Sequence, residues 1–326
     1  MYESFYGLSA KPFQLRPAPQ FFFDSKGHKK AMAYLDYGLA QGEGFIIITG
    51  EVGAGKTTLV RNLLNRLPAD EIVAAQIANT HLNSEDTLRM VLAAFGLPSH
   101  EVSKSALLVR LEQFLRSCDS QGKRALLIVD EAQNLSPRTV EELRMLSNFQ
   151  TDDRSLLQTF LLGQPEFRAT LHGPDMSQLR QRVIATYHLG PMDEPETKAY
   201  IEHRLRTVGW TGSPSITAAA YAAIFAYAGG IPRTTNHLCD RLLLMGYLEE
   251  MRAFDGADVA TVVSDIRSEA LLPAPTSAPG VGVVADTDTL DDRMVRVERS
   301  VVSVLNLLKK IMATPGANLS QMNNNE

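Results

Sequence analysis

Short apolar runs alternate with longer amphipathic segments over the first 190 residues of the chain. A continuous apolar run predicts a strand buried on both faces, whereas apolar residues three or four positions apart predict a helix. The expected strands cover 45–49, 72–77, 125–129, 156–162 and 183–189. The expected helices cover 29–41, 56–67, 83–95, 103–117, 136–149, 166–171 and 176–182. This alternation predicts an α/β fold in which right-handed crossovers build a five-stranded, mainly parallel sheet covered by helices on both faces.

The pattern becomes all-helical from Asp193 onwards. Helical periodicity covers 193–208, 215–228, 234–250 and 256–270, and we expect no further strand there. A boundary near Pro191 follows from this change of period. We therefore predict a core domain over 29–191 and a small helical second domain over 192–271.

A proline- and alanine-rich stretch follows, which predicts a flexible linker over 272–289. Beyond it, apolar residues step by four and three alternately, as in a coiled-coil seam. These residues are Leu290, Met294, Val297, Val301, Val304, Leu308 and Ile311. The amphipathic helix expected over 290–312 either packs on its own chain or forms a short coiled coil with a second copy or a partner. The polar tail over 313–326 is expected to be disordered.

Composition narrows the class of protein without identifying it. The chain is 44% hydrophobic and 21% charged, as is usual for a soluble globular protein. Its net charge of −5 argues against an extended nucleic-acid-binding face. Cys118 and Cys239 lie far apart and form neither a disulfide framework nor a zinc-binding spacing. We find no signal peptide and no apolar run near the roughly 18 residues of a membrane span, so we expect a cytoplasmic protein.

The strongest chemical signal is a glycine-rich loop between the first strand and the helix after it. The loop residues are Gly50, Glu51, Val52, Gly53, Ala54, Gly55, Lys56, Thr57 and Thr58. Glycines let successive backbone N–H groups turn toward an anion, and the helix N-terminus adds its positive end. Lys56 is suited to the β- and γ-phosphates of a nucleotide, and the Thr57 hydroxyl to Mg²⁺. The strand before the loop and the helix after it favour nucleotide binding over an ordinary glycine turn.

Polar residues follow two of the other predicted strands. Asp130 and Glu131 end the third strand, and Gln164 ends the fourth. Ligands gather at the carboxyl ends of parallel strands, so we expect these side chains beside the loop. There Asp130 would hold Mg²⁺ through its water shell, Glu131 would polarise the attacking water, and Gln164 would lie between that water and the γ-phosphate. Without the loop, the same residues would be interpreted as a solvated strand end and a turn.

Three arginines are candidates for neutralising phosphate charge. Arg180 and Arg182 precede the fifth strand, where they either form local salt bridges or include an arginine finger for a neighbouring subunit, Arg182 being preferred. Arg233 opens a helix of the second domain and could reach back to the nucleotide and report its state.

The aromatic and proline-rich residues 1–28 cannot be one long helix. They are interpreted as a strap that covers core surface, and the part over 21–28 as flanking the nucleotide base; the two roles are compatible.

Taken together, the motifs resemble those of AAA+ ATPases, with Asp130 and Glu131 as Walker B, Gln164 as sensor 1 and Arg233 as sensor 2. More narrowly, the chain resembles the general secretion pathway protein A (ExeA-like) family, and in particular the ATPases associated with exosortase and exopolysaccharide loci in Gram-negative bacteria. The segments that carry this resemblance are 2–8, 11–13, 130–135, 141–149 and 162–166. The resemblance covers about residues 1–270.

The resemblance implies ATP and Mg²⁺ as ligands, hydrolysis of ATP to ADP and phosphate, and a homo-oligomer that could be a ring. It further implies an assembly factor or regulator of an envelope exopolysaccharide-export or protein-sorting system. Secretion-pathway members typically continue into a membrane span and a periplasmic peptidoglycan-binding domain. This chain has the linker and the heptad helix at that place, so we expect a protein without a membrane span. It would lie at the inner membrane through partner proteins that bind the C-terminal helix.

Two other classes stay open. One is a DNA-bound AAA+ ATPase, either a transposition helper or an initiator-like protein. The acidic balance of the chain and the lack of a winged-helix-sized domain after Leu271 argue against it. The other is a nucleotide-dependent scaffold that hydrolyses ATP slowly and works as a switch.

Overall fold

The five predicted strands form a single parallel sheet in the computed structural model, which describes residues 1–16, 18–78, 84–100 and 103–270. The strands are β1 (Phe45–Gly50), β2 (Ile72–Ile77), β3 (Arg124–Val129), β4 (Leu157–Gly163) and β5 (Val183–Leu189). Their order is β2-β3-β4-β1-β5, and every neighbouring pair is parallel. The predicted fold class is thereby confirmed.

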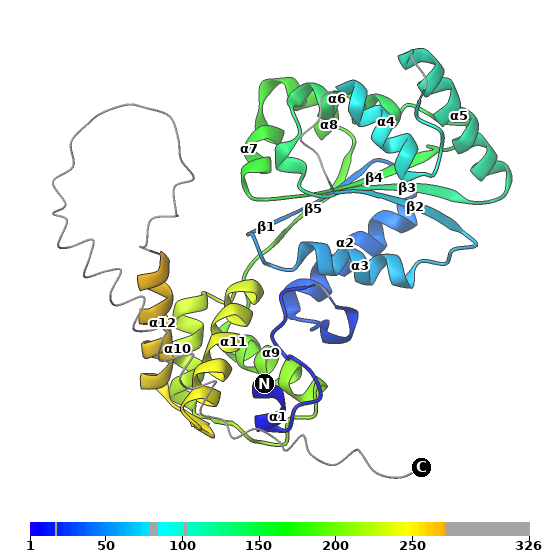
Figure 1. Ribbon diagram of the computed structural model, residues 1–326. Coiled ribbons are helices and arrows are strands. Elements are labelled where there is room, and N and C mark those ends of the chain that lie inside the picture. The colour runs from blue at the N-terminus through cyan, green and yellow to red at the C-terminus, as the bar shows by residue number, and fades with distance from the viewer. Residues whose placement is uncertain (17, 79–83, 101–102, 271–326) are drawn as a thin grey trace, which may run out of the picture. The chain divides into compact units, whose positions relative to one another are not determined.

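Alternate residues of the strands β1, β2, β3 and β4 enter different hydrophobic cores, because successive side chains of a strand point to opposite faces. Phe45 and Ile47 of β1 pack with one set of helices, and Ile46 and Ile48 pack with the other. The first face is covered by α4 (Ser84–Ala94), α5 (Lys104–Ser120), α6 (Pro137–Leu146), α7 (Glu166–His172) and α8 (Ser177–Arg180). The second is covered by α2 (Lys26–Gln41) and α3 (Lys56–Arg66). Figure 1 shows the two layers on either side of the sheet.

The helix α2 begins at Lys26, earlier than the predicted start at residue 29. Ser25 caps it, since the Ser25 hydroxyl accepts a hydrogen bond from the His28 backbone N–H at 3.2 Å. Capping by serine satisfies a donor that the first helical turn leaves unpaired. The predicted strap over 1–28 therefore ends inside a helix.

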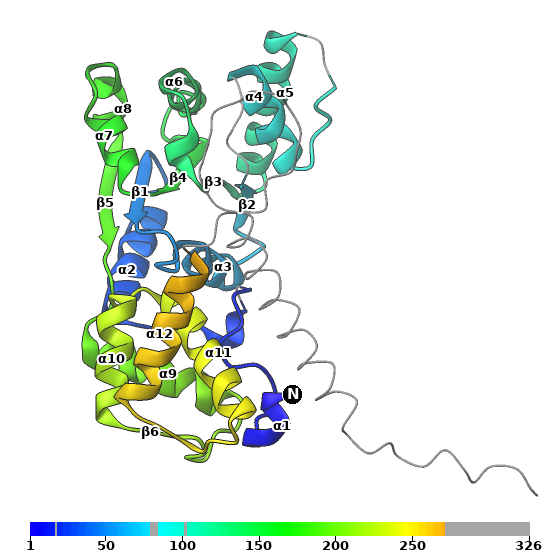
Figure 2. The same cartoon turned by 60° about the vertical axis from the view of Figure 1, so that its left-hand side comes forward.

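After β5 the chain folds into the predicted helices, α9 (Glu194–Thr207), α10 (Ala218–Ala228), α11 (Pro232–Leu248) and α12 (Gly256–Ala270) (Figure 2). The expectation of no further strand was wrong. The short strands β6 (Ser215–Ile216) and β7 (Ala253–Phe254) pair in parallel, so α10 begins later than predicted, with Thr217 as its N-cap. A two-residue strand is too short to give a periodicity of its own. The domain boundary near residue 191 stays a prediction.

The N-terminal residues pack against this helical region and not against the sheet. The short helix α1 (Tyr2–Tyr6) contributes Tyr2 and Tyr6 to a core that α9, α10, α11 and α12 share. Phe21, in the 3₁₀ turn η1 (Pro19–Phe21), lies in the same core. This segment therefore covers core surface, as predicted, and the surface is that of the helical region. The predicted linker, heptad helix and tail, 272–326, lie outside the described residues.

No helix in the described part of the chain combines the length and the apolar character that crossing a membrane requires.

Candidate nucleotide-binding site

The glycine-rich loop lies between the end of β1 and the start of α3, as predicted. Gly53 and Gly55 have φ angles of 83° and 102°, a region that glycine enters at no steric cost. Each is also crowded by a neighbour. A Cβ on Gly53 would lie 2.4 Å from the Cβ of Arg233, and one on Gly55 would lie 2.6 Å from Nε2 of His28. The loop is thus a close-fitting backbone cradle of the kind that phosphate groups occupy.

Lys56 opens α3 and turns its side chain back over the loop. Its ammonium group donates to the carbonyl oxygens of Gly50, at 2.6 Å, and Glu51, at 3.0 Å. The residue is only 6% exposed, and burial lowers the pKa of Lys56, an effect that Glu131 and Asp130 oppose. The ammonium is held by neutral oxygens, which a charged phosphate could replace with stronger hydrogen bonds.

Thr57 and Asp130 meet at the carboxyl edge of the sheet. The Thr57 hydroxyl donates to Oδ2 of Asp130 at 2.9 Å, and the backbone N–H of Glu131 donates to Oδ1 at 3.0 Å. Asp130 is 3% exposed, and burial raises its pKa while the hydrogen bond from Thr57 lowers it. A hydroxyl and a carboxylate are hard oxygen donors that fit Mg²⁺, an ion usually bound through one or two protein groups together with substrate phosphates.

Glu131 and Gln164 lie side by side at the same edge. Nε2 of Gln164 donates to Oε2 of Glu131 at 3.3 Å. Glu131 has a φ of 54°, the left-handed region that costs a non-glycine residue about 1 kcal/mol or more. Strained backbone of this sort is concentrated at functional sites, where surrounding contacts hold it in place.

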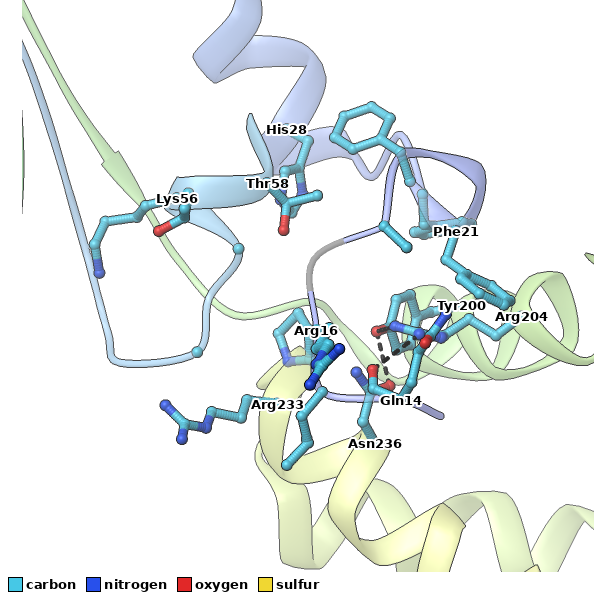
Figure 3. A pocket seen from close by; sticks show the side chains of 18 of the residues that line it. Gln14, Arg16, Phe21, His28, Lys56, Thr58, Tyr200, Arg204, Arg233 and Asn236 are labelled. Carbon is cyan, nitrogen blue, oxygen red and sulfur yellow. Dashed lines mark hydrogen bonds between the residues drawn. The ribbon is translucent and has the colours of Figure 1, made fainter. Parts of the chain in front are cut away.

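Arg233 reaches the loop from the first turn of α11. Its backbone N–H donates to the carbonyl oxygen of Gly53 at 3.2 Å. The turn before it lies against the chain leaving β5, since a Cβ on Gly230 would fall 2.0 Å from the Met192 carbonyl oxygen. Figure 3 shows the Arg233 side chain extending from α11 on the side of the loop and Lys56.

One pocket of about 360 Å³, of the size that holds small ligands, is lined by Gly53, Gly55, Lys56, Thr57, Glu131, Gln164 and Arg233. Asp130, which accepts the hydrogen bond from Thr57, does not itself line it. The stretch over 21–28 is interpreted above as flanking the nucleotide base, and four of its residues, Phe21, Phe22, Phe23 and His28, line this pocket. It also holds residues that were not predicted, namely Gln14, Arg16, Tyr200, Arg204 and Asn236 (Figure 3).

Arg204 holds this second group of lining residues together through its hydrogen bonds. It is 6% exposed and donates to the carbonyl oxygens of Pro12, at 2.6 Å, and Gln14, at 3.2 Å. It also donates to the Tyr200 hydroxyl at 2.8 Å, which donates in turn to Oδ1 of Asn236 at 2.8 Å. Arg204 therefore joins the N-terminal segment to α9 and α11. In the sequence, Arg204 could have been recognised as a buried residue, because it is a charged residue on the apolar side of a predicted helix, next to Leu205.

Arg180 and Arg182 do not line the pocket. Arg182 donates to the Ser147 hydroxyl at 2.6 Å and to the Asn148 side-chain oxygen. Arg180 donates to the carbonyl oxygens of Leu171 and Gly173 at 2.6 and 2.8 Å. The structure gives neither arginine a salt bridge with a described residue, in contrast to the local alternative considered above.

The chain is similar in sequence to known proteins. A family model described as an AAA domain matches residues 39–171. The chain is 40% identical over 273 residues to general secretion pathway protein A of Aeromonas hydrophila. That match covers 82% of this chain and 50% of the relative, so the chain spans about half the length of the relative.

Solved structures resemble the chain in fold. The ORC2 protein of Aeropyrum pernix, in ADPNP–ADP complexes, has a TM-score of 0.59 at 16% identity and covers 79% of this chain and 72% of its own. Cdc6p of Pyrobaculum aerophilum has a TM-score of 0.61 at 16% identity, with 84% and 74% covered. The RuvB branch migration motor of Thermotoga maritima has a TM-score of 0.52 at 19% identity, with 78% and 73% covered. At these identities the likeness concerns the fold alone.

Proposed function

The chain is an ExeA-like member of the AAA+ family, and we propose that it binds ATP with Mg²⁺ and hydrolyses it to ADP and phosphate. The observation that carries the proposal is the lining of one pocket by Lys56, Thr57, Glu131, Gln164 and Arg233. Binding alone would need the loop and its lysine. A carboxylate and an amide placed together at the edge of the same pocket add the groups that orient a water molecule.

Each residue has a task that its contacts support. Lys56 would exchange two carbonyl oxygens for phosphate oxygens. Thr57 and Asp130 would hold the magnesium ion, which when bound neutralises charge on the β- and γ-phosphates. Glu131 would orient the attacking water and accept its proton, and Gln164 would hold that carboxylate in place. Arg233 would bring positive charge from α11 to the loop.

We expect the full chain to release phosphate from ATP in the presence of Mg²⁺, and we expect chelation with EDTA to abolish release. The reason is that Thr57 Oγ1 and Asp130 Oδ2 are the proposed ligands of the cation. Without the cation, the Asp130 carboxylate would repel the phosphate oxygens. The measurement is steady-state phosphate release with and without EDTA, with ADP as a control substrate. Release at an equal rate in EDTA, or no release from ATP at all, would contradict the proposal.

Hydrolysis is further proposed to require two subunits. Arg182 precedes β5, whose first residue, Val183, pairs with Phe45, whereas the loop follows Gly50 at the other end of β1. At about 3.3 Å per residue, a strand of this length separates Arg182 from its own loop by about 20 Å. Arg182 therefore lies far from the phosphate cradle of its own subunit, which supports a role as an arginine finger for a neighbouring one.

Arg182→Ala is expected to lower turnover about 10²- to 10³-fold, while the Kd for ATP changes less than about threefold. The cause is loss of a transition-state charge in the neighbouring site, with the binding loop intact. The control is Arg180→Ala, expected to retain activity. Mixing Arg182→Ala with Lys56→Ala subunits should restore turnover, since one supplies the loop and the other the finger. Failure of mixing to restore turnover, or wild-type activity per subunit that is independent of protein concentration, counts against a shared site.

The process served is proposed to be envelope exopolysaccharide export or protein sorting, with the chain as an assembly factor or regulator. Support comes from the motif resemblance described above and from the similarity to a secretion-pathway protein. The proposed attachment to membrane-associated partners is through residues 290–312, which lie outside the described residues. Capture of export proteins by residues 286–326 from membrane extracts tests this attachment, and a heptad variant that captures equally well would contradict it.

A further inference from the structure

Gln133 connects the two polar residues that end β3 and β4, although it does not itself line the pocket. It lies in the 3₁₀ turn η2 (Ala132–Asn134), directly after Glu131. Its Nε2 donates to Oε2 of Glu131 at 2.6 Å, and its Oε1 accepts a hydrogen bond from the backbone N–H of Gln164 at 2.9 Å. A backbone N–H can only donate, so Oε1 must face Gln164 and Nε2 must face Glu131. The orientation of this amide is therefore determined by its partners.

The contacts form a closed ring. Gln133 bonds Glu131 and the Gln164 backbone, and the Gln164 side chain bonds the same Oε2 of Glu131 at 3.3 Å. The left-handed backbone of Glu131 turns the chain so that the side chain of residue 133 can return to the end of β4. The Glu131 carboxylate is thus held by the side-chain amides of Gln133 and Gln164. Both amides are positioned by the end of β4, one through the Gln164 backbone N–H and the other because Gln164 itself lies there.

On the basis of the proposed hydrolysis, we propose that Gln133 is a positioning residue that holds the Glu131 carboxylate in its catalytic orientation and joins it to Gln164. Glu131 and Gln164 then move as one group when the pocket is occupied. A carboxylate that accepts a proton from water must be within hydrogen-bond reach of it, and small displacements reduce the rate strongly. Gln133 acts through Glu131 and touches neither nucleotide nor water in this scheme.

The test replaces Gln133 with methionine, which has a similar length but neither donates nor accepts strongly, and with glutamate, which can still accept from Gln164 but cannot donate to Glu131 when ionised. In the full chain, both variants are expected to lower kcat about 10- to 100-fold, with KM for ATP within about twofold. Asn134→Ala, in the same 3₁₀ turn, is the matched control and is expected to keep kcat within about twofold.

A double variant separates positioning from a general structural effect. If Gln133 acts through Glu131, adding Gln133→Met to Glu131→Gln will not lower single-turnover phosphate release further. The inference would be overturned if the double variant released phosphate more slowly than Glu131→Gln by the same factor that Gln133→Met alone causes. It would also be overturned if Gln133→Met raised KM by the same factor by which it lowered kcat. If the wild type releases no phosphate, the proposed function fails and this inference with it. If Glu131→Gln abolishes release and Gln133→Met matches the wild type, only this inference fails.

Discussion

Lys56→Ala will abolish measurable ATP binding at micromolar concentrations, with a loss of at least about 100-fold in affinity. The ammonium is almost fully buried over the loop and is positioned by two backbone carbonyl oxygens. Two charge-assisted hydrogen bonds to phosphate oxygens are together worth about 3 kcal/mol, which corresponds to roughly two orders of magnitude in Kd. Alanine at this position leaves the glycine cradle intact but removes the buried ammonium group that lies over it.

The measurement is calorimetric titration of the full chain with ATP and Mg²⁺. Lys30→Ala, which removes an exposed lysine of α2, is the matched control and should bind as the wild type does. Thermal unfolding of the apoprotein checks that the variant is folded. Tight ATP binding by the Lys56→Ala protein would show that this pocket is not the nucleotide site.

Glu131→Gln will bind ATP with unchanged affinity and will hydrolyse it about 10²- to 10⁴-fold more slowly. The amide keeps the size of the carboxylate and still offers an oxygen to Gln133 and Gln164, but it cannot accept a proton from water. Binding is expected to persist because the phosphate contacts belong to the loop, Lys56 and Thr57. Single-turnover phosphate release and ATP titration measure the two effects separately.

Glu166→Gln is the control for loss of negative charge alone. Glu166 is exposed in the first turn of α7, near enough to influence Lys56, and it does not line the pocket. This variant should hydrolyse ATP within about threefold of the wild type, as is usual for a surface substitution. Equal losses in both variants would mean that Glu131 contributes only charge and is not the proton acceptor.

Glu131→Gln also separates an enzyme that drives assembly from a scaffold switch. A protein that remains loaded with ATP stays in its nucleotide-bound conformation. If partner capture from membrane extracts depends on ATP and is unaffected by the loss of hydrolysis, the switch interpretation is favoured. If capture or release requires turnover, the assembly-factor interpretation is favoured. Lys56→Ala provides the nucleotide-free reference for both.

Much of the fold follows from local sequence. The apolar runs at 45–49 and 125–129 are too continuous for a half-exposed strand, so they predict a sheet covered on both faces. The glycine-rich loop, Asp130 and Gln164 each follow such a run, and parallel strands bring their carboxyl ends to one edge. The phosphate cradle can be predicted from the sequence because its chemistry depends on residues that are adjacent in the chain.

The rest depends on contacts between distant residues. Periodicity carries no information on which strands pair, so only the structure places β1 between β4 and β5, with Gln164 beside the loop and Arg182 at the opposite edge. The pocket wall built around Arg204 depends on its hydrogen bond to the Pro12 carbonyl, 192 residues away in sequence. The role of Gln133 was likewise not predicted, because the function of an amide side chain depends on which partners lie beside it in space.

For this protein the sequence by itself determined the fold class and the residues suited to phosphate, whereas the tertiary structure decided which side chains share a pocket. The reason is that backbone periodicity is a local property, while a binding site is assembled by packing between elements far apart in the chain.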